Sequence, residues 1–212
     1  ELETVSYALD DPRGGEYLAQ AAELAAGSTS RKLEVVLRGR EGVLLRSRGL
    51  LEEAAVKLEL AVRLARQLDH AGYLVTALQN QGNLLNEIHR ADAARPLLEE
   101  AAGLARSVLG PDHTTTAQVE MSLGRSLSML HDLEAAERLC RHALDVFERA
   151  SGPDHPDLVF PLMFLADILH VRGHFEDARE VLRRAAALAL AFGQGGRIEA
   201  SALGNLATLS GE

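Results

Sequence analysis

The chain has 212 residues, a formal net charge of −9 and a hydrophobic fraction of 47%, with only 4% aromatic residues and no Trp. The negative charge argues against a nucleic-acid backbone or an anionic membrane as the main partner, because both need a clustered excess of Lys and Arg. The apolar residues are mostly Leu, Ala and Val, which favours closely packed helices over a β-sandwich core. The longest apolar run, 158–166, is too short to span a membrane, and the single cysteine, Cys140, cannot form an internal disulfide.

The first 30 residues predict a degenerate helical hairpin, with a short helix at 2–9, a turn at 10–15 and an Ala-rich helix at 16–26. Because the chain begins at Glu1 without Met and closes inside an apparent repeat, we expect it to be a fragment of a longer protein. Its basic residues are almost all Arg, and this composition suggests a bacterial source.

From residue 31 the pattern predicts pairs of helices joined by short turns. The expected helices lie at 31–48 and 50–67, 72–89 and 91–108, 114–131 and 133–150, 156–172 and 175–192, with a partial pair at 197–209. The predicted organisation is one continuous domain with a leading hairpin at 1–30 and repeats at 31–70, 71–111, 112–153, 154–195 and, in part, 196–212.

The tetrapeptide Gly-Pro-Asp-His occurs at 110–113 and again at 152–155, 42 residues later. A fixed period of this length is typical of a solenoid, in which each unit buries its apolar face against its neighbours. We expect Gly to end one helix, Pro to stop its continuation and Asp112 or Asp154 to cap the next helix, while the two histidines pack or hydrogen-bond nearby. A metal site at these histidines would need further ligands that the spacing does not supply.

Small residues also return at matching positions. The first helix of each pair has Gly42, Gly82, Gly124, Ala166 or Ala207 at the same point. The second helices repeat a trio of Ala, a larger residue and Ala: Ala54, Leu58 and Ala61; Ala94, Leu98 and Ala101; Ala136, Cys140 and Ala143; Ala178, Leu182 and Ala185. Glycine inside a helix costs about 1 kcal/mol relative to Ala, so its return predicts a contact too close for a methyl group.

This combination of small, large and small residues resembles the tetratricopeptide repeat over residues 31–209, although the usual large aromatic early in the first helix is missing. The 42-residue spacing and the Gly-Pro-Asp-His loop resemble the kinesin-light-chain-type variant. The resemblance implies an all-α fold, a right-handed α-solenoid of stacked antiparallel helix hairpins. It also implies a concave groove lined by the first helices.

Helical geometry predicts which side chains line that groove. With the recurring small residue as zero, offsets −6, −3, −2, +1, +4 and +5 fall within about 40–160° on one face, away from the core positions at −1 and +3. We call the residues at these offsets the inner strip. We expect the partner to contact its members Arg40, Arg46, Gln79, Asn80, Asn83, Asn86, Met121, Arg125, Met129, Phe160, Met163, Phe164 and Asn205.

The inner strip has mixed chemistry. Its methionines and phenylalanines suit varied apolar partners, its amides can pair with any peptide backbone, and its arginines can clamp a carboxylate. Alternatively, the Met and Phe side chains belong to the core and the arginines to a solvated face. Glu87 and Asp167 dilute the positive charge, whereas a groove for acidic cargo motifs of the kinesin-light-chain kind would be more uniformly basic.

No zinc-binding His pair, phosphate-binding loop or nucleophile elbow is present in the sequence, so we expect no enzyme, no catalytic or metal-ligating residue and no cofactor. The preferred hypothesis is a non-catalytic, cytoplasmic interaction module that binds a peptide segment or partner protein in the groove. The alternative is a sensor or regulatory domain of a larger bacterial signalling protein that responds to a peptide or small effector. A third possibility is self-association through exposed repeat ends.

Overall fold

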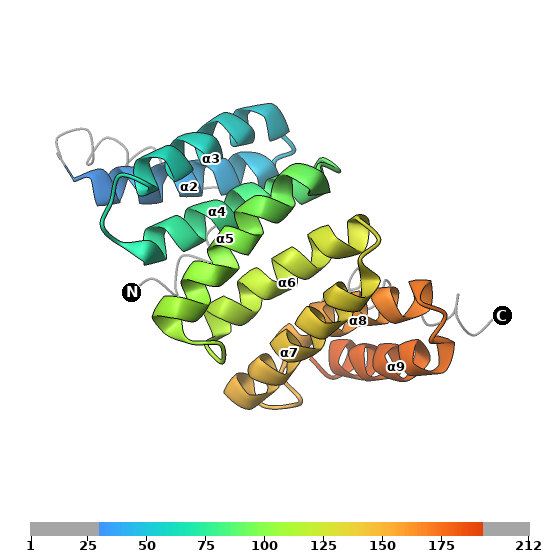
Figure 1. The fold of residues 1–212 in the computed structure, drawn as a ribbon. Coiled ribbons are helices and arrows are strands. Elements are labelled where there is room, and N and C mark those ends of the chain that lie inside the picture. The colour runs from blue at the N-terminus through green and yellow to red at the C-terminus, as the bar shows by residue number, and fades with distance from the viewer. Residues whose placement is uncertain (1–29, 193–212) are drawn as a thin grey trace. The chain divides into compact units, whose positions relative to one another are not determined.

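The computed structural model describes residues 30–192. The expected leading hairpin and the partial fifth repeat, including Asn205, lie outside the described residues. The chain divides after Val108 into two compact units, and each is described by itself (Figure 1).

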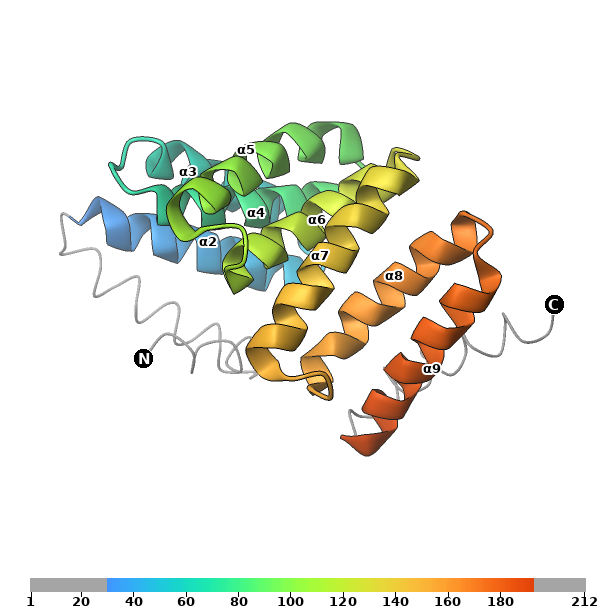
Figure 2. The ribbon, with the colours of Figure 1, turned by 60° about the horizontal axis from the view of Figure 1, so that its bottom comes forward.

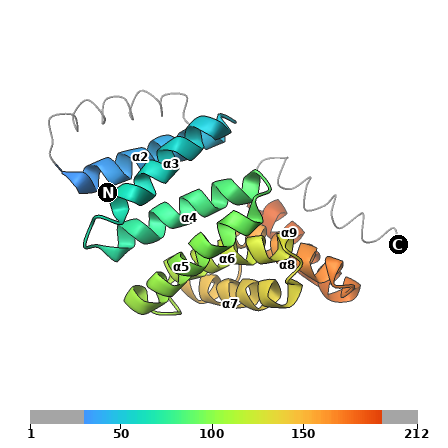
Figure 3. The same ribbon diagram turned by 45° about the horizontal axis from the view of Figure 1, so that its top comes forward.

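Unit 1 contains four helices in two antiparallel pairs, α2 (Arg31–Ser47) with α3 (Leu51–Ala65) and α4 (Ala71–Glu87) with α5 (Ala91–Leu109). Figure 3 shows α2 and α3 side by side, and α4 packs against both of them. These bounds agree closely with the predicted helices.

The predicted close contacts are present at Gly42 and Gly82, whereas a Cβ added to Gly124 would make only an ordinary contact, 3.4 Å from the carbonyl oxygen of Ala136. A Cβ atom added to Gly42 would lie 2.5 Å from Cγ of Leu58, and one added to Gly82 would lie 2.6 Å from Cγ of Leu98. Both leucines are fully buried. The paired helices of unit 1 are therefore in contact where the first helix has no side chain, which confirms the reason for the repeated small residue.

Unit 2 contains α6 (Thr114–Met129), α7 (Leu133–Ser151), a 3₁₀ turn η3 (Pro156–Leu158), α8 (Val159–Val171) and α9 (Phe175–Ala191). Figure 2 shows α7, α8 and α9 as successive neighbours, and α6 packs on α7. The helix expected from 156 begins as a 3₁₀ turn and becomes α-helical only at Val159. Pro161 has no N–H to donate to the carbonyl of Asp157, so one α-helical bond is missing at the start of α8.

The helix-joining turns use a left-handed residue at one repeat position. Gly49, His89, His131 and Gly173 occupy it, with φ of 76°, 59°, 63° and 80°. The two histidines adopt a left-handed conformation that is uncommon for residues other than Gly but in which His, like Asn and Asp, is enriched.

The prediction that Asp112 and Asp154 cap the helices after the Gly-Pro-Asp-His loops is wrong. Histidine is the N-cap in both copies: Nδ1 of His113 accepts a bond from the backbone N–H of Thr115 at 3.1 Å, and Nδ1 of His155 accepts one from Asp157 at 3.3 Å. The aspartate lies one residue too early to reach the first free N–H groups. Asp112 pairs with Arg149 instead.

Candidate peptide-binding surface

In unit 1 the amides of the inner strip lie on α4. Gln79, Asn80 and Asn83 are half-buried, so each keeps part of its side chain accessible. Nδ2 of Asn80 lies 4.0 Å from the point where a Cβ on Gly39 of α2 would be. A Cβ on Gly39 would make an ordinary van der Waals contact with this amide, which places Asn80 directly beside α2.

Asn86 is a correction to the predicted site. Its residue is only 1% exposed, and its side chain interacts within the protein. Offset +4 lies at the edge of the inner strip nearest the core, so the packing of unit 1 covers this position. Asn86 cannot offer its amide to a ligand in this conformation.

The three arginines of the predicted site differ in their surroundings. Nε of Arg46 lies 3.6 Å from a carboxylate oxygen of Glu87, which links α2 to α4 and partly neutralises the Arg46 charge. Within residues 30–192, no ion pair is made by Arg40, which is half-buried, or by Arg125, which is exposed. These two guanidinium groups fit the predicted carboxylate clamp better than Arg46 does.

In unit 2 the apolar members of the inner strip fall into two groups. Met121 packs on a buried cluster of Ala117, Ala143 and Val146, which matches the alternative that it belongs to the core. Phe164 is half-buried, and its ring comes within 3.7 Å of the point where a Cβ on Gly124 would be. Met129 and Met163 are also half-buried, whereas Phe160 is 60% exposed. Among the apolar inner-strip residues of unit 2, the most accessible side chains therefore lie on α8.

From the sequence, Asp167 on α8 was expected only to dilute the positive charge of the inner strip. Its residue is exposed, yet desolvation by the surrounding protein raises the pKa of its carboxyl, and the nearby His170 opposes this shift in part. Asp167 stands 42 residues after Arg125, at the same repeat position. That register match between opposite charges was the signal that could have singled it out.

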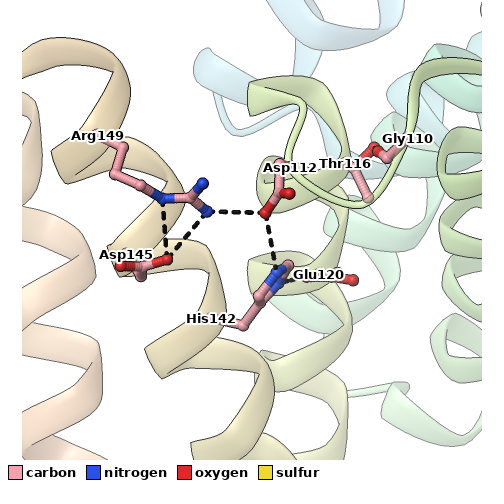
Figure 4. A network of polar contacts seen from close by, with 7 residues as sticks. All are labelled: Gly110, Asp112, Thr116, Glu120, His142, Asp145 and Arg149. Carbon is pink, nitrogen blue, oxygen red and sulfur yellow. Dashed lines mark hydrogen bonds and ion pairs between the residues drawn. The ribbon is translucent and has the colours of Figure 1, made fainter.

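A polar network joins the 110–113 loop and α6 to α7 (Figure 4). Glu120 is 2% exposed, and its carboxylate lies 2.6 Å from Nδ1 of His142. Nε2 of His142 is 3.9 Å from Asp112, whose carboxylate accepts a 2.7 Å bond from Arg149. The hydrogen bond from Arg149 lowers the pKa of Asp112, and Arg149 also pairs with Asp145. The network supplies partners for a buried charge and has a structural role.

The second buried carboxylate of unit 2 also has partners on two helices. Glu137 is 5% exposed and pairs with Arg141 of α7 and with Arg172 at the end of α8. Arg184 of α9 bonds both Glu148 and the carbonyl of Pro153, at 2.5 and 2.6 Å. These ion pairs hold α7, α8 and α9 together and leave the inner strip of α8 uninvolved.

Neither a metal site nor a reactive thiol is found in the described part of the chain. Within it, no group of three or more His, Cys, Asp or Glu side chains is placed to hold a metal ion. Burial raises the pKa of the Cys140 thiol to about 12, and its Sγ lies 3.8 Å from the carbonyl of Pro161. None of the helices from α2 to α9 is both long and apolar enough to cross a membrane.

A tetratricopeptide repeat profile matches residues 73–139 and 116–191, which together cover more than half of the chain. The chain belongs to the tetratricopeptide repeat family. This confirms the family predicted from the recurring small residues, and repeats of this family generally act as interaction modules. A comparison with curated protein sequences found no match.

Solved structures of similar fold include BtubC (BKLC) from P. vanneervenii, with a TM-score of 0.76 and 18% identity over 92% of this chain and 79% of that one. TPR-like repeats assigned as a kinesin light chain from Podosopora anserina give 0.68 and 17%, over 81% and 83% of the two chains. The apo form of RapI gives 0.71 and 13%, over 84% and 63%. At these identities the likeness shows the fold, and it confirms the predicted all-α solenoid class.

Proposed function

We propose that this tetratricopeptide repeat chain is a non-catalytic module that holds a peptide segment or a partner protein against the inner strip of its first helices. The observation that carries the proposal is the row of accessible amides on α4. Asn80 and Asn83 lie one helical turn apart and are both half-buried, and the amide of Asn80 lies beside Gly39 of α2. A side-chain amide has both a donor and an acceptor, so it can bond a peptide backbone whatever the peptide sequence.

The accessible apolar residues of unit 2 support the same function. Phe160 exposes 60% of its surface on the inner strip of α8, beside the half-buried Met163 and Phe164. Burying one Leu-sized anchor contributes about 1.5–3 kcal/mol, and each amide bond contributes about 0.5–1.5 kcal/mol net. After the costs of ordering a peptide, a few such contacts correspond to micromolar binding.

The test is an arrayed library of short peptides, followed by calorimetric titration of those that bind. The double substitution Asn80→Ala and Asn83→Ala is expected to weaken binding about tenfold, because two backbone contacts are lost. Gln67→Ala is the matched control, since Gln67 is an exposed amide just after α3 and outside the inner strip. Equal binding by the double variant and the wild type would contradict the proposal, as would the failure of every peptide to bind.

A further inference from the structure

The inner strip of α8 presents one continuous stripe of side chains. Phe160 and Val171 are 60% and 61% exposed, Asp167 is exposed, and Met163 and Phe164 are half-buried between them. We call these five residues the α8 stripe. Their spacing of three or four residues places them on one side of the helix, over a length of about 16 Å. The stripe is therefore apolar at both ends and carries a carboxylate between them.

Among residues 30–192, the carboxylate of Asp167 has no Lys or Arg as an ion-pair partner, and Arg125, at the same repeat position on α6, makes no ion pair with it. Within that part of the chain, His170, one turn further along α8, is the one residue whose charge favours the carboxylate. The His170 ring packs against Phe175 with centroids 5.4 Å apart. Desolvation raises the pKa of the Asp167 carboxyl, which shows that the surrounding protein disfavours its charge.

Other carboxylates of unit 2 differ in this respect. Glu134 pairs with Arg138 at 3.0 Å, Glu176 with Arg179 at 2.7 Å, and Glu148 with Arg184 at 2.5 Å. Those acids are neutralised within the protein and have little left to offer a partner. Within residues 30–192 Asp167 has no Lys or Arg as an ion-pair partner, and desolvation by the surrounding protein disfavours its charge. A cation supplied from outside would therefore gain more there than beside a fully solvated carboxylate.

We propose that the α8 stripe docks a peptide segment of another protein in which a Lys or Arg is flanked on both sides by apolar residues. This inference rests on the proposed function and names the chemistry of its partner. An acidic segment would be repelled by Asp167, and a wholly apolar one would bury its carboxylate without a partner, which is costly. A basic side chain satisfies both parts of the stripe, because its aliphatic stem covers the Met and Phe side chains while its charge reaches the carboxylate.

The experiment uses short fluorescent peptides in matched sets. One set has a central Lys or Arg with Leu, Phe or Met within four positions on each side, and two further sets replace the central residue with Gln or Glu. Fluorescence anisotropy is measured with the wild-type chain and with Asp167→Asn, Asp167→Lys and the control Glu180→Gln. Glu180 is an exposed acid on α9, outside the α8 stripe, and its substitution removes the same single charge.

The basic set is expected to bind about tenfold more tightly than the Gln set and more tightly still than the Glu set. Asp167→Asn should remove this preference, Asp167→Lys should transfer it to the Glu set, and Glu180→Gln should leave it unchanged. Binding that is equal for all three sets, or a basic preference that survives Asp167→Asn, would overturn the inference while leaving the proposed function standing. If no peptide of any set binds, the proposed function fails together with the inference.

Discussion

The first helices α4 and α8 carry different side chains at the same repeat positions. At offsets −6, −3, −2 and +1, α4 has Thr76, Gln79, Asn80 and Asn83, whereas α8 has Phe160, Met163, Phe164 and Asp167. The position that packs on the second helix stays small in both, Gly82 in α4 and Ala166 in α8, and both are buried. This comparison shows that helix packing determines which repeat positions are buried and which are accessible. The side chain at each accessible position then determines whether the surface there is polar or apolar.

The largest change in stability is expected at the small repeat position, where α4 and α8 are most alike. Gly82→Val should lower the free energy of unfolding by about 3 kcal/mol, because the new side chain would overlap Leu98 in a filled core. Urea denaturation measures this change. Gly103→Ala is the control, since nothing lies within 4 Å of a Cβ there and the substitution should stabilise α5 by about 0.5–1 kcal/mol. Equal stability of Gly82→Val and the wild type would show that the close contact does not govern packing.

The next effect concerns a core position at which α6 differs from both α4 and α8. Glu120 stands where α4 has Leu78 and α8 has Leu162, and all three are buried. His142→Ala should cost about 2 kcal/mol, because it removes the bond between the buried Glu120 carboxylate and the imidazole. Glu120→Leu should be neutral or stabilising, since α4 and α8 accept Leu at this position. Thermal unfolding separates the two variants, and a large loss with Glu120→Leu would mean that the Glu120–His142 pair itself stabilises unit 2.

A third prediction exchanges the surface chemistry of the two helices. Replacing Thr76, Gln79, Asn80 and Asn83 by Phe, Met, Phe and Asp should give α4 the preference of α8 for basic peptides with apolar flanks. The expected gain for those peptides is about tenfold, because apolar burial and a carboxylate are added together. Anisotropy titration measures it in a chain that also carries Asp167→Asn. If the grafted chain binds those peptides no more tightly, the side chains at these four repeat positions do not by themselves determine the peptide preference.

The smallest effect is a pH dependence that belongs to α8. Because the pKa of Asp167 is raised in the folded protein, the folded state binds more protons than the unfolded state above the ordinary Asp value of 3.8. The contribution of Asp167 to the free energy of unfolding is therefore lost as the pH rises above 3.8 and passes the raised pKa of the folded state. Asp167→Asn should be more stable than wild type at pH 7 by about 0.5 kcal/mol after solvent screening, with the difference vanishing on acidification toward pH 4. Chemical denaturation over the same pH range measures the free energy of unfolding of these proteins. The variant Asn83→Asp, which puts an aspartate at the same repeat position on α4, is measured for comparison.

The helices and their small contact residues could be predicted because both follow from a local period. Gly42 and Gly82 meet Leu58 and Leu98 as the recurring pattern indicated. The inner strip was predicted less well. Its angles place Asn83 and Phe160 on accessible surface, but Asn86 is buried and Met121 packs on the core. Helical angles alone do not say how far the neighbouring helix extends over the edge of a strip.

The amino-acid sequence by itself determined the family, the helix ranges and the positions that must stay small, because each depends on residues within one or two helical turns or on the 42-residue period. Only the tertiary structure showed that His113 caps α6, that Glu120 pairs with His142 and that Arg46 pairs with Glu87. It also showed that no Lys or Arg among residues 30–192 pairs with Asp167. Most of these contacts join helices that are distant along the chain, and side-chain reach and desolvation decide which charges find a partner there.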